Sequence, residues 1–146
     1  MTAGRRAGRA LRRAIRVAGL GGAICASAVA SADSTRSGEQ VYRQVCATCH
    51  GTGYEKAPRL GDRSAWAPRL ERGQDVLTAH AWVGVRSMPA RGGRPDLALE
   101  EFARGAAHMA RAAGAIWSDP DLPQLERIRE EERKRLIALG IRAGPR

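Results

Sequence analysis

Two cysteines and a histidine occur within five consecutive positions, as Cys46, Cys49 and His50 of the run Cys-Ala-Thr-Cys-His. In one helical turn, two thiols at this spacing can each form a thioether with a vinyl group of haem. The histidine that follows then lies beneath the porphyrin, where an imidazole nitrogen can bind the iron. The motif therefore predicts a single covalent haem c, attached through Cys46 and Cys49, with His50 as an iron ligand.

A Cys-x-x-Cys pair is also typical of redox dithiols and of zinc sites. A thioredoxin-like dithiol follows a strand in a βαβ unit, and the sequence shows no such pattern around Cys46. A zinc site needs additional ligands, and the one remaining cysteine, Cys25, lies in a segment that we expect to be removed. Both alternatives are therefore weaker than haem attachment.

The first 32 residues have the composition of a secretory signal peptide. Six arginines precede an apolar stretch over residues 17–30, and Ala30-Ser31-Ala32 is a typical cleavage site. An apolar stretch of about 14 residues is shorter than the roughly 20 that span a bilayer, so cleavage is favoured over a retained membrane anchor. We therefore expect residues 1–32 to be removed, a periplasmic location, and no membrane span in the mature chain.

Charge argues for a protein partner rather than a nucleic acid. The formal net charge is +10, and the six arginines of residues 1–32 account for +6 of it. The remaining basic residues are interleaved with glutamates, and no nucleic-acid-binding motif is present. A mildly cationic mature surface is suited to redox partner proteins, an electron donor and an acceptor, with acidic faces.

The spacing of apolar residues predicts helices and no strands. Ser37 and Gln40 form a capping box before a helix that carries the haem motif and ends at Gly51–Gly53. Further helices are expected over residues 64–71 with Ser64 as cap, 75–83, 96–114 with Asp96 as cap, and 121–139. The six aromatic residues are few for a core, which a haem would complete. The expected fold is all-α, with three to four helices around one haem in a domain over residues 33–114.

Residues 115–146 form a separate, charged C-terminal extension. Asp121 with Gln124 can start a helix here, but its apolar stripe is thin and interrupted. We favour a solvated helix or a partly disordered segment, and a docking element for a partner protein is the alternative.

A haem held by His50 alone would have a five-coordinate iron. Met88 is the preferred sixth ligand, because it lies in an irregular segment that Pro89 can stiffen and Gly92-Gly93 can turn. A methionine thioether favours ferrous iron and raises the potential. Packing in predicted helices accounts for the three rival candidates, Met109, His80 and His108.

Residues 37–113 resemble the short bacterial periplasmic monohaem cytochromes c of class I, particularly the c-five kind. The resemblance covers the haem motif, the loop from Ala57 to Asp62, Trp66 with Arg69, the segment from Met88 to Gly92, and a closing helix from Leu99 to Met109. It implies the class I cytochrome c fold, a proline loop near the proximal histidine, and Gly38 and Tyr42 at a contact with the last core helix. We call the segment from Met88 to Gly92 the methionine loop. Some relatives have a cysteine pair after this loop, where this chain has Arg94 and Leu97.

These observations predict periplasmic electron transfer by one c-type haem with His/Met ligation, and no catalytic residues. One alternative is a haem enzyme or a gas- or ligand-binding protein with an open distal site, which Met88 argues against. Another is a cytochrome subunit docked in a larger redox complex, for which the charged extension is the only support.

Overall fold

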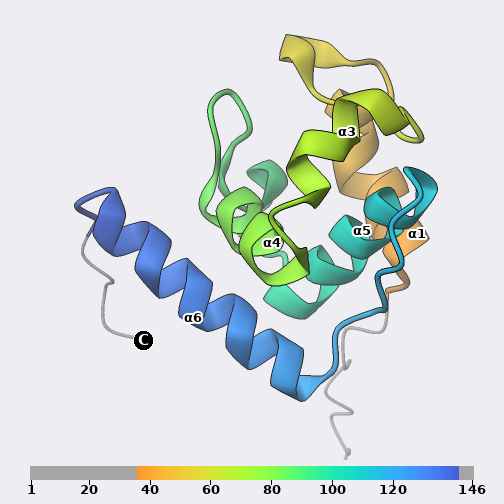
Figure 1. Cartoon of the computed structure of the whole chain (residues 1–146). Coiled ribbons are helices and arrows are strands. Elements are labelled where there is room, and N and C mark those ends of the chain that lie inside the picture. The colour runs from red at the N-terminus through yellow and green to blue at the C-terminus, as the bar shows by residue number, and fades with distance from the viewer. Residues whose placement is uncertain (1–35, 142–146) are drawn as a thin grey trace, which may run out of the picture. The chain divides into compact units, whose positions relative to one another are not determined.

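The computed structural model describes residues 36–141, and this part of the chain is helical (Figure 1). Its only β-type pairing is an isolated bridge between Val85 and Met88, so the all-α prediction is confirmed. Within the same residues, no helix is both long and apolar enough to cross a membrane. The expected signal peptide and its cleavage site lie outside the described residues.

A continuous helical segment from Gly38 to His50 delivers the cysteine motif at its end. It consists of α1 (Gly38–Val41), a π turn (Tyr42–Cys46) and α2 (Ala47–His50). The predicted capping box is present: the Gln40 N–H donates to Ser37 Oγ (3.2 Å), and the Ser37 N–H donates to Gln40 Oε1 (2.8 Å).

The π turn is a feature that periodicity did not predict. The Ala47 N–H bonds to the carbonyl of Tyr42, five residues back, instead of four. A π turn of this kind adds one residue to the helical turn, which rotates all later side chains around the axis. The turn therefore helps to determine which face of the helix presents the cysteines and His50.

Two helices follow, α3 (Arg63–Leu70) and α4 (Gln74–Val83), each starting one residue before its predicted position. The prediction of Ser64 as cap of α3 was wrong. The Asp62 carboxylate is the cap, accepting from the Ala65 N–H (3.0 Å), and the Ser64 hydroxyl supports it by donating to the same oxygen (2.7 Å). Short 3-10 turns, η2 (Tyr54–Lys56) and η3 (Ala90–Gly93), lie in the connecting loops.

The long core helix is α5 (Leu99–Ala112). Phe102 and Met109 of this helix are buried in the core, as is Ala113, which follows it. The prediction of Asp96 as its cap was wrong, because Ala98 occupies that position and Asp96 is paired with Arg94 (Nη2 to Oδ2, 2.9 Å).

Helices α1 and α5 cross with their backbones in contact, as the resemblance implied for Gly38. A Cβ at Gly38 would overlap the carbonyl oxygen of Arg104, and one at Gly105 would lie 2.9 Å from Val41 Cγ1. Glycine at both positions is what lets the two helices approach this closely. The crossing fixes the first helical segment, and therefore the cysteine motif, against the core helix.

Gly38→Ala is accordingly expected to lower the free energy of unfolding by about 1–3 kcal/mol, the usual cost of overpacking. Denaturant unfolding followed by circular dichroism would measure it. Glu39→Ala is a matched control, because Glu39 is exposed and its ion pair with Arg43 lies within the same helical segment. Equal stability of the two variants would contradict this description of the crossing.

The extension contains helix α6 (Leu122–Ala138), which begins with the predicted cap: the Gln124 N–H donates to Asp121 Oδ1 (2.8 Å). The favoured interpretation of this helix as solvated needs correction, because α6 packs along α4 (Figure 1). Leu125 and Ile128 are buried, and Arg127 Nε pairs with Asp75 Oδ2 of α4 (2.9 Å). The apolar stripe is thin because polar contacts provide much of this attachment.

Candidate haem site

The three residues of the cysteine motif lie at the end of the first helical segment. Cys46 and His50 are 8% and 7% exposed, whereas Cys49 is half-buried. Cys46 belongs to the apolar core cluster that also contains Val41, Trp66 and Phe102. The helix thus turns its motif toward the interior of the domain.

The ring of His50 is held in one tautomer. Its Nδ1 lies 2.8 Å from the carbonyl oxygen of Pro58. Because a carbonyl oxygen can only accept, Nδ1 carries the hydrogen, and Nε2 of the neutral ring keeps its lone pair for a metal. A hydrogen bond from the other ring nitrogen to a carbonyl also makes the ligand nitrogen more basic and fixes the ring's orientation.

The loop that supplies this carbonyl is tied to the helix and to α3. The Leu60 N–H donates to the His50 carbonyl (2.9 Å), and the Trp66 indole N–H donates to the Arg59 carbonyl (2.8 Å). The ring of Trp66 stacks on that of His50, with 5.8 Å between centroids and 29° between planes. Backbone and aromatic contacts together therefore define where Nε2 points.

The surroundings of Cys46 favour neutral sulfur. Burial raises the pKa of the Cys46 thiol to about 11, with a smaller contribution from Cys49. Reactive dithiols and zinc ligands require thiolates, which are favoured by the opposite shift. A thioether carries no charge, so this surrounding suits haem attachment better than either alternative use of the motif.

Met88 lies in a tight turn at the end of the loop after α4. The Val85 N–H donates to the Met88 carbonyl (3.1 Å) and the Met88 N–H donates to the Val85 carbonyl (2.9 Å). The side chain is half-buried and packs against the core cluster that includes Cys46 and Trp66. The structure thus gathers Cys46, Met88 and, through Trp66, His50 around one apolar cluster.

The loop after Met88 rests on the first helical segment. A Cβ at Gly92 would come within 3.0 Å of Val45 Cγ1, the residue next to Cys46. Gly92 also has a positive φ of 64°, which glycine adopts without strain. The glycine predicted to turn this loop therefore also permits its close approach to the cysteine helix.

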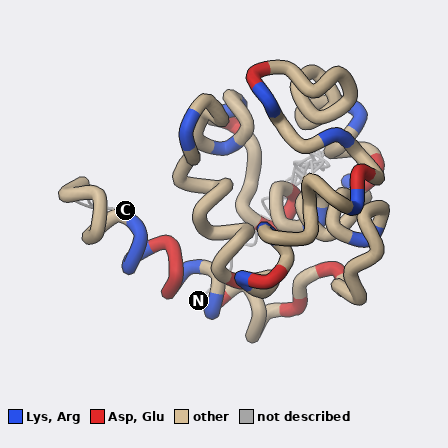
Figure 2. The backbone as a smooth tube through the Cα atoms, turned by 45° about the horizontal axis from the view of Figure 1, so that its top comes forward, with Lys and Arg blue, Asp and Glu red and all other residues tan. Residues whose placement is uncertain are grey.

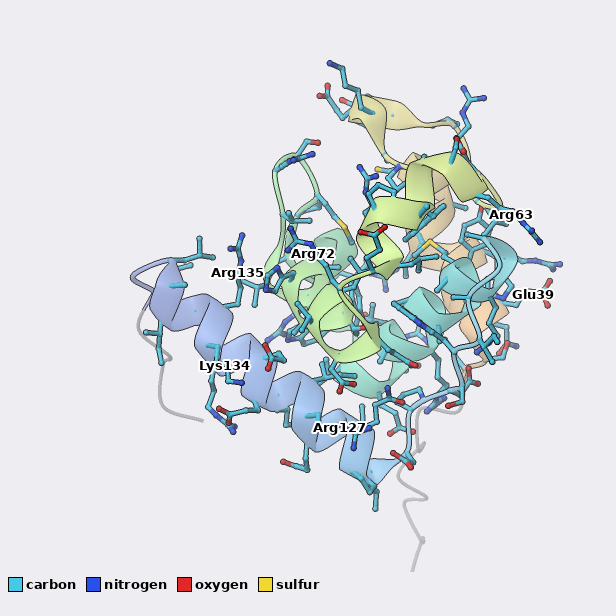
Figure 3. The ribbon with its side chains drawn as sticks, viewed as in Figure 1. Glu39, Arg63, Arg72, Arg127, Lys134 and Arg135 are labelled. Atoms are coloured by element: carbon cyan, nitrogen blue, oxygen red, sulfur yellow. The ribbon has the colours of Figure 1, made fainter. Side chains whose placement is uncertain are left out.

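The rival ligands have other contacts. Met109 is buried in the core face of α5, and the ring of His108 lies 5.6 Å from that of Tyr42. His80 Nδ1 lies 3.5 Å from Arg72 Nη1, and its pKa is lowered by burial and by the charges of Arg135 and Arg72. Figure 3 shows Arg72 and Arg135 together beside α4, so His80 belongs to the α4–α6 side.

The donors and the core both fit a haem. The available groups are the sulfur of Cys46 in the apolar cluster, that of Cys49, the Nε2 of His50 and the thioether of Met88. Among residues 36–141, the buried aromatic side chains are those of Trp66, Trp82 and Phe102. With so few large side chains in the core, a haem would add a large share of its apolar surface.

Sequence reasoning assigned no contact or role to Trp82, Arg91 or Glu132, although Arg91 lies in the segment from Met88 to Gly92 that the resemblance covers. Arg91 lies over the ring of Trp82, and the Trp82 indole N–H donates to Glu132 Oε1. Trp82 and Glu132 are 50 positions apart. No motif or period in the sequence links them, since the contact depends on how α6 packs on α4.

Comparison with known proteins identifies the family. The family described as "Cytochrome C oxidase, cbb3-type, subunit III" matches residues 33–109, more than half of the chain. Cytochrome c-555 of Chlorobaculum tepidum is 35% identical over 103 residues, covering 68% of this chain and 95% of the relative. Cytochrome c5 of Azotobacter vinelandii is 39% identical over 69 residues, covering 46% and 83% respectively.

A similar solved structure supports the same family assignment. It is described as "Crystal structure of electron transfer complex of nitrite reductase with cytochrome c", and the matched chain is 42% identical, with a TM-score of 0.50. The match covers 52% of this chain and 93% of that one. The chain therefore belongs to the small, c5-like class I monohaem cytochromes c, with their fold and a covalently bound haem c.

Proposed function

We propose that this protein is a periplasmic electron carrier whose haem is attached through Cys46 and Cys49 and whose iron is held by His50 and Met88. The observation that carries the proposal is the 2.8 Å bond from His50 Nδ1 to the Pro58 carbonyl, which leaves Nε2 for the iron. When bound, the haem supplies a one-electron Fe(III)/Fe(II) couple.

The role of the chain in this function is to hold both ligands still. His50 is fixed by the Pro58 carbonyl and by the Trp66 ring, and Met88 by its reciprocal bonds with Val85. Ligands fixed in this way move little between redox states, which keeps the reorganisation on electron transfer small. The methionine thioether favours the ferrous state and raises the potential.

A cationic surface supports protein partners. The loops over residues 54–59 and 85–94 carry the exposed side chains of Lys56, Arg59 and Arg86. Ser87 Oγ donates to the Glu55 carbonyl (3.4 Å) and so joins the two loops, along which Figure 2 shows Lys and Arg. Such a surface steers encounters with acidic redox proteins, which are brief and small in area. The relative solved with nitrite reductase supports a partner of this kind.

The alternative functions have less support. A haem enzyme or gas-binding protein needs an open distal position, whereas Met88 is held in a bonded turn against the core cluster. A docked subunit was suggested only by the charged extension; Leu125 and Ile128 of α6 are buried within this chain, whereas Leu122 and Ile137 of the same helix are exposed.

Protein-film voltammetry of the holo-protein separates the carrier from the enzyme. We expect one reversible one-electron wave that is unchanged by nitrite, hydrogen peroxide or oxygen, because a six-coordinate iron has no position for substrate. Carbon monoxide should leave the wave in place for the same reason. A catalytic current with any of these substrates, or a wave shifted by carbon monoxide, would contradict the proposal.

A further inference from the structure

We propose that Glu132 of the C-terminal helix is a positioning residue for the methionine loop. Glu132 holds the indole of Trp82, Arg91 of the loop stacks on that indole, and the stack keeps Met88 in its binding position. This inference rests on the proposed ligation of iron by Met88. It assigns to α6, which lies beyond the residues of the family match, a role at the haem.

The first contact joins α6 to α4. The Trp82 N–H donates to Glu132 Oε1 at 2.9 Å, and Trp82 is 7% exposed. An indole has a single donor and no acceptor, and leaving that donor buried and unbonded is costly. Trp82 also packs edge-on against Phe102 of α5, with 5.3 Å between ring centroids. The carboxylate and Phe102 therefore fix the plane of the Trp82 ring.

The second contact joins Trp82 to the methionine loop. The Arg91 guanidinium carbon lies 4.8 Å from the Trp82 ring centroid, a cation–π geometry. Arg91 Nη1 also donates to the Pro95 carbonyl (2.8 Å), so the side chain spans the loop. Arg91 has a φ of 54°, a left-handed conformation that disfavours side chains. The contacts of Arg91 with the Trp82 ring and the Pro95 carbonyl stabilise this conformation.

The Glu132 carboxylate, the Trp82 indole and the Arg91 guanidinium lie in sequence, and each contact strengthens the next. A carboxylate that accepts from the indole N–H increases the electron density of the ring, which strengthens its attraction for a guanidinium. Arg91 is separated from Met88 only by Pro89 and Ala90. Because the ring of Pro89 restricts its φ, the position of Arg91 limits where Met88 can lie. Holding Arg91 therefore limits how far Met88 can swing away.

Packing of α6 against α4 fixes the position of Glu132. Leu125, Ile128 and Glu132 follow at spacings of three and four and so share a helix face. Leu125 and Ile128 are buried, and Gln124 Nε2 donates to Asp75 Oδ1 of α4 (3.1 Å). Because this end of α6 is fixed to α4, Glu132 is held next to Trp82 rather than free to rotate away.

The test measures how easily imidazole displaces methionine from ferric iron in the full-length holo-protein. The apparent imidazole affinity is proportional to the fraction of molecules in which the loop is open. Glu132→Ala is expected to tighten imidazole binding about tenfold, the typical factor for losing one charge-assisted hydrogen bond. Glu132→Gln keeps an acceptor oxygen for the Trp82 N–H, so it should bind imidazole nearly as weakly as the wild type does.

Two further variants separate positioning from charge and from general stability. Glu130→Ala removes the same charge from the same helix, but Glu130 pairs with Arg133 of that helix, so its imidazole affinity should stay at the wild-type value. Trp82→Phe keeps a ring beneath Arg91 and lacks the N–H, so it should behave like Glu132→Ala. The double variant should bind imidazole no more tightly than either single variant, because both remove one contact.

The proposal is overturned if Glu132→Ala binds imidazole like the wild type, if Glu130→Ala tightens binding equally, or if the double variant is additive. These outcomes leave the proposed function intact when the wild type shows the weak long-wavelength absorption band of methionine on ferric iron. A wild-type protein without that band overturns the proposed ligation and, with it, the role of Glu132.

Discussion

The double variant Cys46→Ser with Cys49→Ser is expected to contain no covalently attached haem when it is expressed in a host with periplasmic haem attachment. Serine hydroxyls do not add to haem vinyl groups, so neither thioether can form. Haem staining of a denaturing gel and the mass of the intact polypeptide would both show the loss. Cys25→Ser is the matched control, because it removes the third cysteine and should leave haem attachment unchanged.

The loss of attachment should also unfold much of the domain. Side chains alone build a thin core, and haem would contribute the largest apolar surface in it. Limited proteolysis should therefore degrade the double variant far faster than the wild type. A stable double variant that retains covalent haem would refute the assignment of Cys46 and Cys49.

Met88→Ala is expected to retain covalent haem and to lose the sixth ligand. The reduction potential should fall by on the order of a few tenths of a volt, within the roughly 0.8 V over which axial ligands set haem potentials. The iron should then bind imidazole and carbon monoxide readily, because no side chain occupies the distal position. Potentiometric titration and ligand-binding spectra would measure both effects.

A matched pair of variants controls for packing. Met88→Leu and Met109→Leu each remove one sulfur and nearly conserve side-chain volume, which typically costs less than about 1.5 kcal/mol. Met109 is buried in α5, and only Met88 lies in the bonded turn. We therefore expect Met88→Leu to lose the long-wavelength band and Met109→Leu to keep it. A Met88 variant with the wild-type potential and spectrum would exclude this ligand.

The sequence predicts the helices of this protein well because their apolar spacing reflects burial. The first helical segment, α3, α4 and α5 all occur close to their expected positions, and the capping box of Ser37 and Gln40 is present. The cap of α6 is also present as predicted, whereas the caps of α3 and α5 were predicted wrongly. Asp62 and Ser64 are both good capping residues two positions apart, and only the path of the preceding loop decides which one caps α3.

Tertiary contacts explain what the sequence did not predict. The thin stripe of α6 suggested a solvated helix, but Asp75 and Trp82 of α4 supply polar partners that an apolar pattern does not count. The resemblance implied a proline loop near His50, but the bond from its Nδ1 to the Pro58 carbonyl, which sets the ring's orientation, depends on backbone that no motif encodes. Where relatives can have a cysteine pair, Leu97 is instead buried in the core cluster and Arg94 pairs with Asp96.

The most direct test of the account is the optical spectrum of the purified ferric and ferrous holo-protein, recorded with and without added imidazole or carbon monoxide. Ligation by His50 and Met88 predicts the weak long-wavelength band of methionine on ferric iron, a low-spin spectrum, and poor uptake of either ligand. A high-spin spectrum with ready ligand binding would contradict it and would indicate an open iron.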